Sequence, residues 1–159
     1  MILLTLLFFT SCQSEELKHQ IILITPQGHE IQTAIAVTLE EQQKGLSGIA
    51  DSDFAPNQGL FFYYTEEDYR NFWMPDTYFD LDLFYLDKDL RIIDIVRRLQ
   101  HYKGKANPEL IPRARPVWCL HVLEMKHDST IAKSLQLGDL LKIKDSQRST
   151  SEYLKQKLK

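Results

Sequence analysis

The sequence has no excess of positive charge and no long apolar segment. Its 159 residues carry 19 Lys and Arg against 22 Asp and Glu, which gives a formal net charge of -3. A protein that binds nucleic acid needs a basic surface to neutralise phosphates, so we expect no nucleic-acid partner. The most apolar segment, Met1 to Phe9, is too short for a membrane-spanning helix, which needs about 20 residues.

Cysteine is rare, and the histidines are not clustered. The two cysteines are Cys12 and Cys119. A single domain of this length can bury enough apolar surface to fold without a metal or a disulfide. The histidines occur singly in separate segments, without the close spacing of zinc sites: His19, His29, His101, His121 and His127. We therefore expect no metal site and no cofactor.

The first twenty residues change abruptly in character. Residues 1–9 are almost wholly apolar, whereas residues 13–20 are polar and charged. Such a break is typical of a cleaved signal peptide. The segment Phe9-Thr10-Ser11-Cys12 resembles a bacterial lipobox, in which the cysteine thiol receives a diacylglyceryl group. It departs from that pattern in two ways, because Phe9 is bulkier than the usual Leu and no Lys or Arg precedes the apolar run.

These features predict an exported protein. We expect a lipoprotein-type signal peptide over residues 1–11, a lipid anchor on Cys12 and a tether over residues 12–19. Several acyl chains on one cysteine would supply the second signal that stable anchoring requires. Because Gln13 rather than Asp follows Cys12, the anchor would lie in the outer membrane, facing the periplasm, if the bacterium has two membranes. The alternatives are an ordinary cleaved signal peptide and a buried N-terminal strand.

Residues 20–144 are predicted to form one mainly β domain. Runs rich in Ile at 20–25 and 30–37 flank Pro26-Gln27-Gly28-His29, which predicts a hairpin. Aromatic and branched side chains in short runs, separated by turn-forming residues, predict further strands. These lie at 59–64, 71–74, 81–86, 91–96, 117–124 and 140–144.

Two short helices are expected within this domain. Thr38 and Glu41 form a capping-box pattern for a helix over residues 39–44. Asp128 is a plausible N-cap for a second helix over residues 129–135.

Two segments show no clear periodicity. Residues 99–116 hold Gly104 and three prolines, which predicts an exposed excursion across the domain. Residues 145–159 are polar and rich in lysine, so we expect a C-terminal tail that frays in solvent.

Short motifs along the domain resemble the DUF192 family, whose biochemical role is not established. The resemblance covers about residues 30–144 and implies a small, mostly antiparallel, barrel-like β domain that is frequently exported or membrane-associated. It is carried by Gly45-Leu46, Gly59-Leu60-Phe61-Phe62, Phe72-Trp73-Met74-x-x-Thr77, Leu81-Asp82-x-Phe84, Leu123-Glu124 and Gly138-Asp139.

The chain departs from the family pattern at three places. Pro75-Asp76 stands where Lys-Asn is usual, and Ser47-Gly48-Ile49 stands where an Arg is usual. Met125-Lys126-His127 lacks an expected glycine. If the two missing basic side chains bind an anion in relatives, this chain binds something else or has lost that function.

The turn between Trp73 and Asp82 concentrates aromatic and polar side chains. Aromatic rings stack on sugars and on apolar ligands, although most of the rings between residues 61 and 85 are needed to fill the core. We expect the following residues to bind a ligand or partner: Trp73, Met74, Asp76, Thr77 and Asp82.

Asp82 is the most informative of these residues. Strand alternation places Leu81, Leu83 and Tyr85 on one face, and Asp82 with Phe84 and Leu86 on the other. A carboxylate on an apolar face must be paired or hydrogen-bonded. Thr77, the Trp73 indole and an arginine such as Arg97 or Arg98 are its candidate partners.

A catalytic alternative uses Asp76 and Asp82 as acid and base, assisted by His121 or Tyr102. Asp around Pro75 is equally typical of a tight turn. Alternation along 117–124 places Cys119 and His121 on one face and Glu124 on the other, which leaves Cys119 as an isolated core cysteine.

The sequence therefore favours a non-enzymatic accessory domain, lipid-anchored in the cell envelope. We expect it to bind a small ligand or an envelope protein through the Trp73–Asp82 turn, because no nucleophile, base and orienting group occur at a recognisable spacing. One alternative is an envelope hydrolase that uses Asp82 and Asp76. In another, the turn is structural and function lies in residues 99–116.

Overall fold

The computed structural model describes residues 19–144 and 150–158. The predicted signal peptide, Cys12 and most of the tether lie outside these residues. The described elements, in chain order, are β1 (His19–Ile24), β2 (Glu30–Ala36), α1 (Leu39–Lys44), η1 (Asp51–Asp53), β3 (Gln58–Phe62), β4 (Asp68–Arg70), β5 (Leu81–Leu86), β6 (Ile92–Leu99), η2 (Pro108–Leu110), β7 (Val117–Cys119), β8 (His121–Lys126), α2 (Thr130–Ser134), β9 (Lys142–Ile143) and α3 (Thr150–Lys157).

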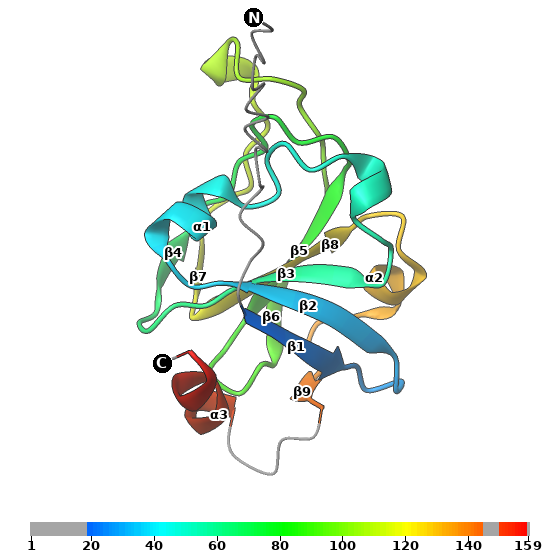
Figure 1. Ribbon diagram of the computed structural model, residues 1–159, viewed down its shortest axis with the longest axis vertical. Coiled ribbons are helices and arrows are strands. Elements are labelled where there is room, and N and C mark those ends of the chain that lie inside the picture. Colours follow the sequence, from blue (N-terminus) through cyan, green and yellow to red (C-terminus); the bar gives the residue numbers. More distant parts are fainter. Residues whose placement is uncertain (1–18, 145–149, 159) are drawn as a thin grey trace, which may run out of the picture.

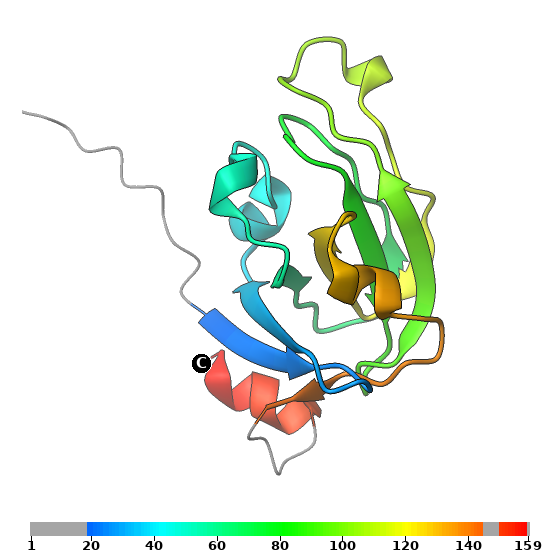
Figure 2. The ribbon, with the colours of Figure 1, turned by 90° about the vertical axis from the view of Figure 1, so that its right-hand side faces the viewer.

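The domain is built on one curled sheet, as Figures 1 and 2 show. Seven strands pair in the order β6-β5-β8-β3-β2-β1-β9, and β4 pairs with β7 in a separate two-stranded sheet. The mainly β, barrel-like prediction is confirmed. The pairing is antiparallel except between β2 and β3, which run parallel. That exception arises because the chain crosses over through α1 and η1 before it returns beside β2.

The predicted hairpin and first helix form as expected. β1 pairs with β2 from His19 opposite Ile35 to Ile24 opposite Glu30. Thr38 Oγ1 accepts from the Glu41 amide at 3.2 Å, and Glu41 Oε2 accepts from the Thr38 amide at 2.9 Å. This reciprocal capping box starts α1, which forms one wall of the pocket described below.

The second helix begins one residue later than predicted. Its N-cap is Ser129 rather than Asp128, because the Ser129 hydroxyl accepts from the Ala132 amide at 3.3 Å. A third helix, α3, replaces part of the predicted tail. Leu154 of α3 is fully buried against the apolar cluster beneath the sheet, so the expectation that residues 150–158 fray in solvent is wrong.

Two predicted strands also need correction. Residues 71–74 form no strand: the short β4 precedes them, and Trp73 makes a single bridge to Arg113. The strand predicted over 117–124 is divided at Leu120 into β7 and β8, which belong to different sheets. Because of this division, the alternation of side-chain directions along β7 does not continue into β8.

The large sheet has an apolar cluster on each face. Leu81, Leu83 and Tyr85 pack in the first cluster, whereas Phe84 and Leu86 pack in the second. This confirms the alternation predicted for β5. No helix in residues 19–144 or 150–158 is long and apolar enough to cross a bilayer.

Candidate functional site

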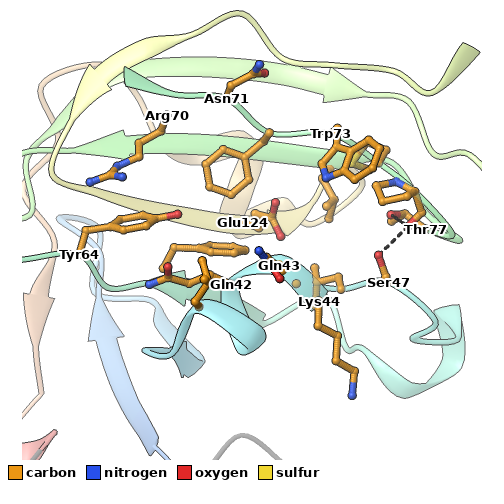
Figure 3. Close-up of a pocket in the computed structure, with 18 of the residues that line it drawn as sticks. Gln42, Gln43, Lys44, Ser47, Tyr64, Arg70, Asn71, Trp73, Thr77 and Glu124 are labelled. Atoms are coloured by element: carbon orange, nitrogen blue, oxygen red, sulfur yellow. Dashed lines mark hydrogen bonds between the residues drawn. The ribbon is translucent and has the colours of Figure 1, made fainter. Parts of the chain in front are cut away.

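A pocket of about 490 Å³ lies between α1 and the segment that follows β4. Its floor comes from β3, β5 and β8, so residues distant in sequence meet there. Figure 3 shows the pocket in close-up. It is lined by Leu39, Gln42, Gln43, Lys44, Gly45, Leu46, Ser47, Phe62, Tyr64, Tyr69, Arg70, Asn71, Phe72, Trp73, Met74, Pro75, Thr77, Leu81 and Glu124.

Glu124 lies on the pocket floor, in the middle of the large sheet. It is opposite Leu60 of β3 and Leu83 of β5, two buried residues of the first apolar cluster. Only 4% of Glu124 is exposed. Its carboxyl group makes no hydrogen bond or ion pair with any residue in the described part of the chain.

This environment changes the acidity of Glu124. Burial raises the pKa of its carboxyl group to about 8, because the ionised form has lost water without gaining a partner. At neutral pH the group is therefore mainly a neutral acid. It can donate one hydrogen bond and accept others.

Tyr64 and Arg70 form one end of the pocket. The Arg70 guanidinium lies 3.6 Å from the centroid of the Tyr64 ring, and its Nη2 donates to the Glu66 carbonyl at 2.6 Å. Burial raises the pKa of Tyr64 to about 12, so its hydroxyl keeps its proton. Arg70 Nε is buried and has no hydrogen-bond partner among the described residues.

Trp73 forms the opposite end and is held from behind by the 99–116 segment. Arg113 lies 4.9 Å from the centroid of the Trp73 ring and pairs with Trp73 in a β-bridge. The Met74 amide donates to the Pro112 carbonyl at 3.1 Å. Trp73 is nevertheless 45% exposed, so part of its ring remains available to a ligand. The predicted excursion is thus a support for the turn.

Three of the five predicted binding residues line the pocket: Trp73, Met74 and Thr77. Asp76 does not. It adopts φ 51°, its amide donates to the Gly104 carbonyl at 2.8 Å, and its Oδ1 accepts from the Gly104 amide at 3.1 Å. These two bonds join the turn to the 99–116 segment, and Tyr78 Oη also donates to Asp76 Oδ1 at 3.0 Å. Asp76 therefore holds the turn in place, with a left-handed backbone that a short polar side chain tolerates.

Asp82 is fully buried and paired, and it does not line the pocket. Its Oδ2 is 2.6 Å from Arg97 Nη1, and its Oδ1 accepts from the Arg98 amide at 2.9 Å. The ring of His127 adds a contact of 2.7 Å between Nδ1 and Oδ1. Of the candidate partners, Arg97 and the Arg98 backbone satisfy this carboxylate, while Thr77 donates to the Pro75 carbonyl instead.

The structure separates His121 from Cys119. His121 stacks on Tyr63 and lies tilted against Phe61 on the side of the second cluster, whereas Cys119 packs in the first cluster. The prediction that they share a face is wrong because the strand divides at Leu120. Burial lowers the pKa of His121 to about 4 and raises that of Cys119 to about 12. Cys119 is therefore an unreactive core cysteine.

Residues 19–144 and 150–158 contain no group of three or more side chains that could hold a metal ion. The pocket lining contains a single acidic residue, Glu124. Asp76, Asp82 and His121 all lie outside that lining, so the structure does not assemble the residues of the predicted catalytic alternative around the pocket.

Sequence reasoning missed Glu124 as a site residue. The signal was a glutamate inside the otherwise apolar run Val122-Leu123-Glu124-Met125. Alternation predicts that such a side chain points inward. It does not reveal that the interior above this position is an open pocket, because α1 and the segment after β4 create that space.

Comparison with known proteins identifies relatives of this chain. The family model DUF192, described as "Uncharacterized ACR", matches residues 22–143. A crystal structure from Sinorhizobium meliloti 1021, described as a "putative transcription regulator", is 26% identical, with a TM-score of 0.60 over 78% of this chain and 92% of that chain. A protein of unknown function from Novosphingobium aromaticivorans DSM 12444 is 23% identical, with a TM-score of 0.61 over 77% of this chain and 83% of that chain. A search of curated proteins finds no significant match.

Proposed function

Because the chain belongs to the DUF192 family, whose description assigns no activity, we propose its function from the geometry of the pocket. The protein is a non-enzymatic domain that binds a small ligand between α1 and Trp73. Trp73, Met74 and Thr77 form one wall of this site, and Glu124 forms its floor. The ligand must offer both hydrogen-bonding groups and an apolar surface.

One observation carries this proposal. Glu124 is a buried carboxyl group that faces a pocket of about 490 Å³ and has no partner among the described residues. Placing a carboxyl group on an otherwise apolar sheet face without a hydrogen bond to the protein carries a free-energy cost. A ligand that bonds to the carboxyl group removes it.

The hydrolase alternative has less support. Asp82 is paired with Arg97, and Asp76 accepts from the Gly104 amide and the Tyr78 hydroxyl, so neither carboxylate is free to act on a ligand in the pocket. Turnover by the purified protein that is lost in Asp82→Asn would restore this alternative. Transcription regulation, the description given to the Sinorhizobium relative, is not carried over, since a net charge of -3 does not favour DNA binding.

Membrane anchoring through Cys12 belongs to the same proposal. It is supported by the apolar run at 1–9 and by the lipobox-like segment that ends at Cys12. The full chain, expressed in a bacterium with a lipoprotein pathway, should partition into detergent and incorporate labelled fatty acid. Cys12→Ser should abolish both, whereas Cys119→Ser should leave both unchanged. Equal labelling of the Cys12→Ser protein would refute the anchor.

Ligand binding is tested by a thermal-shift screen of the full chain against neutral saccharides, amines, carboxylates and nucleosides. A ligand that binds the native state raises the melting temperature. We expect at least one class to do so in the wild type and to fail in Trp73→Ala. Leu137→Ala is the control, because Leu137 is also an exposed apolar residue, at 68%, and does not line the pocket. A screen without any Trp73-dependent shift would argue against the proposed function.

A further inference from the structure

Apart from Lys44 and the buried Nε of Arg70, the polar groups of the lining that bond to no other described residue are electrically neutral and of mixed kind. They are the Glu124 carboxyl, the Tyr64 and Tyr69 hydroxyls, the Gln43 and Asn71 amides and the Trp73 indole N–H, none of which bonds to another described residue. Figure 3 shows Tyr64, Gln43 and Trp73 arranged around Glu124. Together they present donors and acceptors toward one space.

Three further polar side chains of the lining are already used within the protein. Ser47 Oγ donates to the Pro75 carbonyl at 2.6 Å, and Gln42 Nε2 donates to the Tyr63 carbonyl at 2.7 Å. Thr77 is bonded to the same Pro75 carbonyl. The recognition chemistry is therefore set mainly by the unengaged neutral groups.

Charge argues against an ionic ligand. The lining offers an anion little cationic surface, because Lys44 points away from the pocket in Figure 3 and the Arg70 guanidinium is held by the Tyr64 ring, the Glu66 carbonyl and Asp68 at 4.0 Å. The buried Nε of Arg70 is the part of that group that bonds to no described residue. A cation would share the pocket with Arg70. A neutral ligand avoids both penalties.

Aromatic side chains supply the apolar surface. Trp73 is 45% exposed and Tyr69 is 65% exposed, and both line the pocket. One face of the Trp73 ring is covered by Arg113, so the ring is held in place. An immobilised ring provides a flat surface for the C–H face of a ligand at little cost in side-chain entropy.

From this juxtaposition, and resting on the proposed function, we infer that the ligand is a neutral saccharide whose ring packs on Trp73 while its hydroxyl groups bond to Glu124, Tyr64 and Gln43. A sugar ring combines an apolar C–H face with hydroxyl groups that both donate and accept. The site binds this ligand without cleaving it. Glycoside hydrolysis ordinarily uses two carboxyl groups about 5–9.5 Å apart, and Glu124 is the single carboxyl group of the described lining.

The test measures binding of glucose, galactose, N-acetylglucosamine and their disaccharides to the full chain by calorimetry. We expect at least one to bind and to be recovered intact. Trp73→Ala and Glu124→Met should each weaken binding by about tenfold or more, since each removes a principal contact. Glu124→Gln keeps a donor and an acceptor and should retain most of the affinity. Glu40→Met, an exposed change on α1, and Leu137→Ala, an exposed change outside the pocket, should have no effect.

Proton exchange separates this inference from its competitors. A neutral sugar leaves Glu124 protonated, so the binding heat at pH 7 should be the same in phosphate and Tris buffers. A cationic amine would expel the proton, and the two heats would then differ. Trp73-dependent binding of an amine or carboxylate but of no saccharide would overturn the inference and keep the proposed function. Failure of every class would overturn both.

Discussion

Glu124 links the site to stability through its pKa of about 8, against an ordinary value of 4.5. Between these values the folded chain keeps the proton and the unfolded chain releases it. The folded state then binds more protons, so the free energy of unfolding falls as pH rises. The limiting slope for one group is about 1.4 kcal/mol per pH unit.

His121 has the opposite effect over a different range. Burial lowers its pKa from 6.5 to about 4, so the unfolded chain binds more protons between these values, and its contribution to stability rises with pH there. Above pH 6.5 the unfolded histidine also loses its proton. The interval from pH 6.5 to pH 8 therefore reports mainly on Glu124.

We predict that wild-type protein loses stability between pH 6.5 and pH 8, the interval in which burial keeps Glu124 protonated only in the folded state. Glu124→Gln should remove this loss because glutamine does not titrate. Urea unfolding of the full chain at both pH values measures the effect. His121→Gln is the control and should keep the alkaline loss. An equal loss in Glu124→Gln would show that other groups cause it.

The capping box of α1 connects a local helix signal to the pocket wall. Thr38→Ala removes the side-chain acceptor of the Glu41 amide and should lower the free energy of unfolding by about 1 kcal/mol. It should also weaken ligand binding, because α1 carries Gln43 and other lining residues. Chemical unfolding and calorimetry of the same variant measure both quantities.

The other capped helix supplies a matched control for this prediction. Ser129→Ala removes the N-cap of α2, no residue of which lines the pocket. It should cost similar stability and leave ligand affinity unchanged. Equal losses of affinity in Thr38→Ala and Ser129→Ala would mean that binding follows global stability and not the position of α1.

Arg97 joins three elements through one side chain. From β6 it pairs with Asp82 of β5, donates to the Ala132 carbonyl of α2 at 2.8 Å, and contacts the carbonyl of Leu135. Arg97→Met should lower the free energy of unfolding by about 2–3 kcal/mol, because it leaves a buried carboxylate with fewer partners. This expected loss is smaller than the loss caused by breaking a fully buried ion pair, since Arg97 is partly exposed.

Urea unfolding measures this loss, and an exposed ion pair serves as its control. Lys88 pairs with Asp89 at 2.8 Å in full solvent, so Lys88→Met should leave the unfolding midpoint unchanged. If Arg97→Met behaves like Lys88→Met, the contacts of Asp82 do not stabilise the junction of β5, β6 and α2.

The whole domain includes α3, which composition alone assigned to a solvent-exposed tail. Leu154 is fully buried in the second apolar cluster. Leu154→Ala should therefore lower the free energy of unfolding by about 2 kcal/mol or more. Gln156→Ala, at an exposed position of the same helix, should cause no loss. Identical denaturant midpoints for the two variants would support a tail detached from the domain.

Local patterns in the sequence were sufficient for the features that depend on neighbouring residues. The β1–β2 hairpin, the Thr38–Glu41 capping box and the two faces of β5 all follow from turn chemistry and from side-chain periodicity. The short motifs also identified the DUF192 family. Each of these signals lies within a few residues of the structure it predicts.

Features that join distant segments required the tertiary structure. Arg97 was one of several possible partners for Asp82, and only the pairing of β5 with β6 selects it. The division of the strand at Leu120 depends on two sheets that meet there, and it placed His121 away from Cys119. The role of Glu124 follows from an empty space bounded by α1, β4 and β8. Strand periodicity predicts which way a side chain points, but what it meets depends on segments elsewhere in the chain.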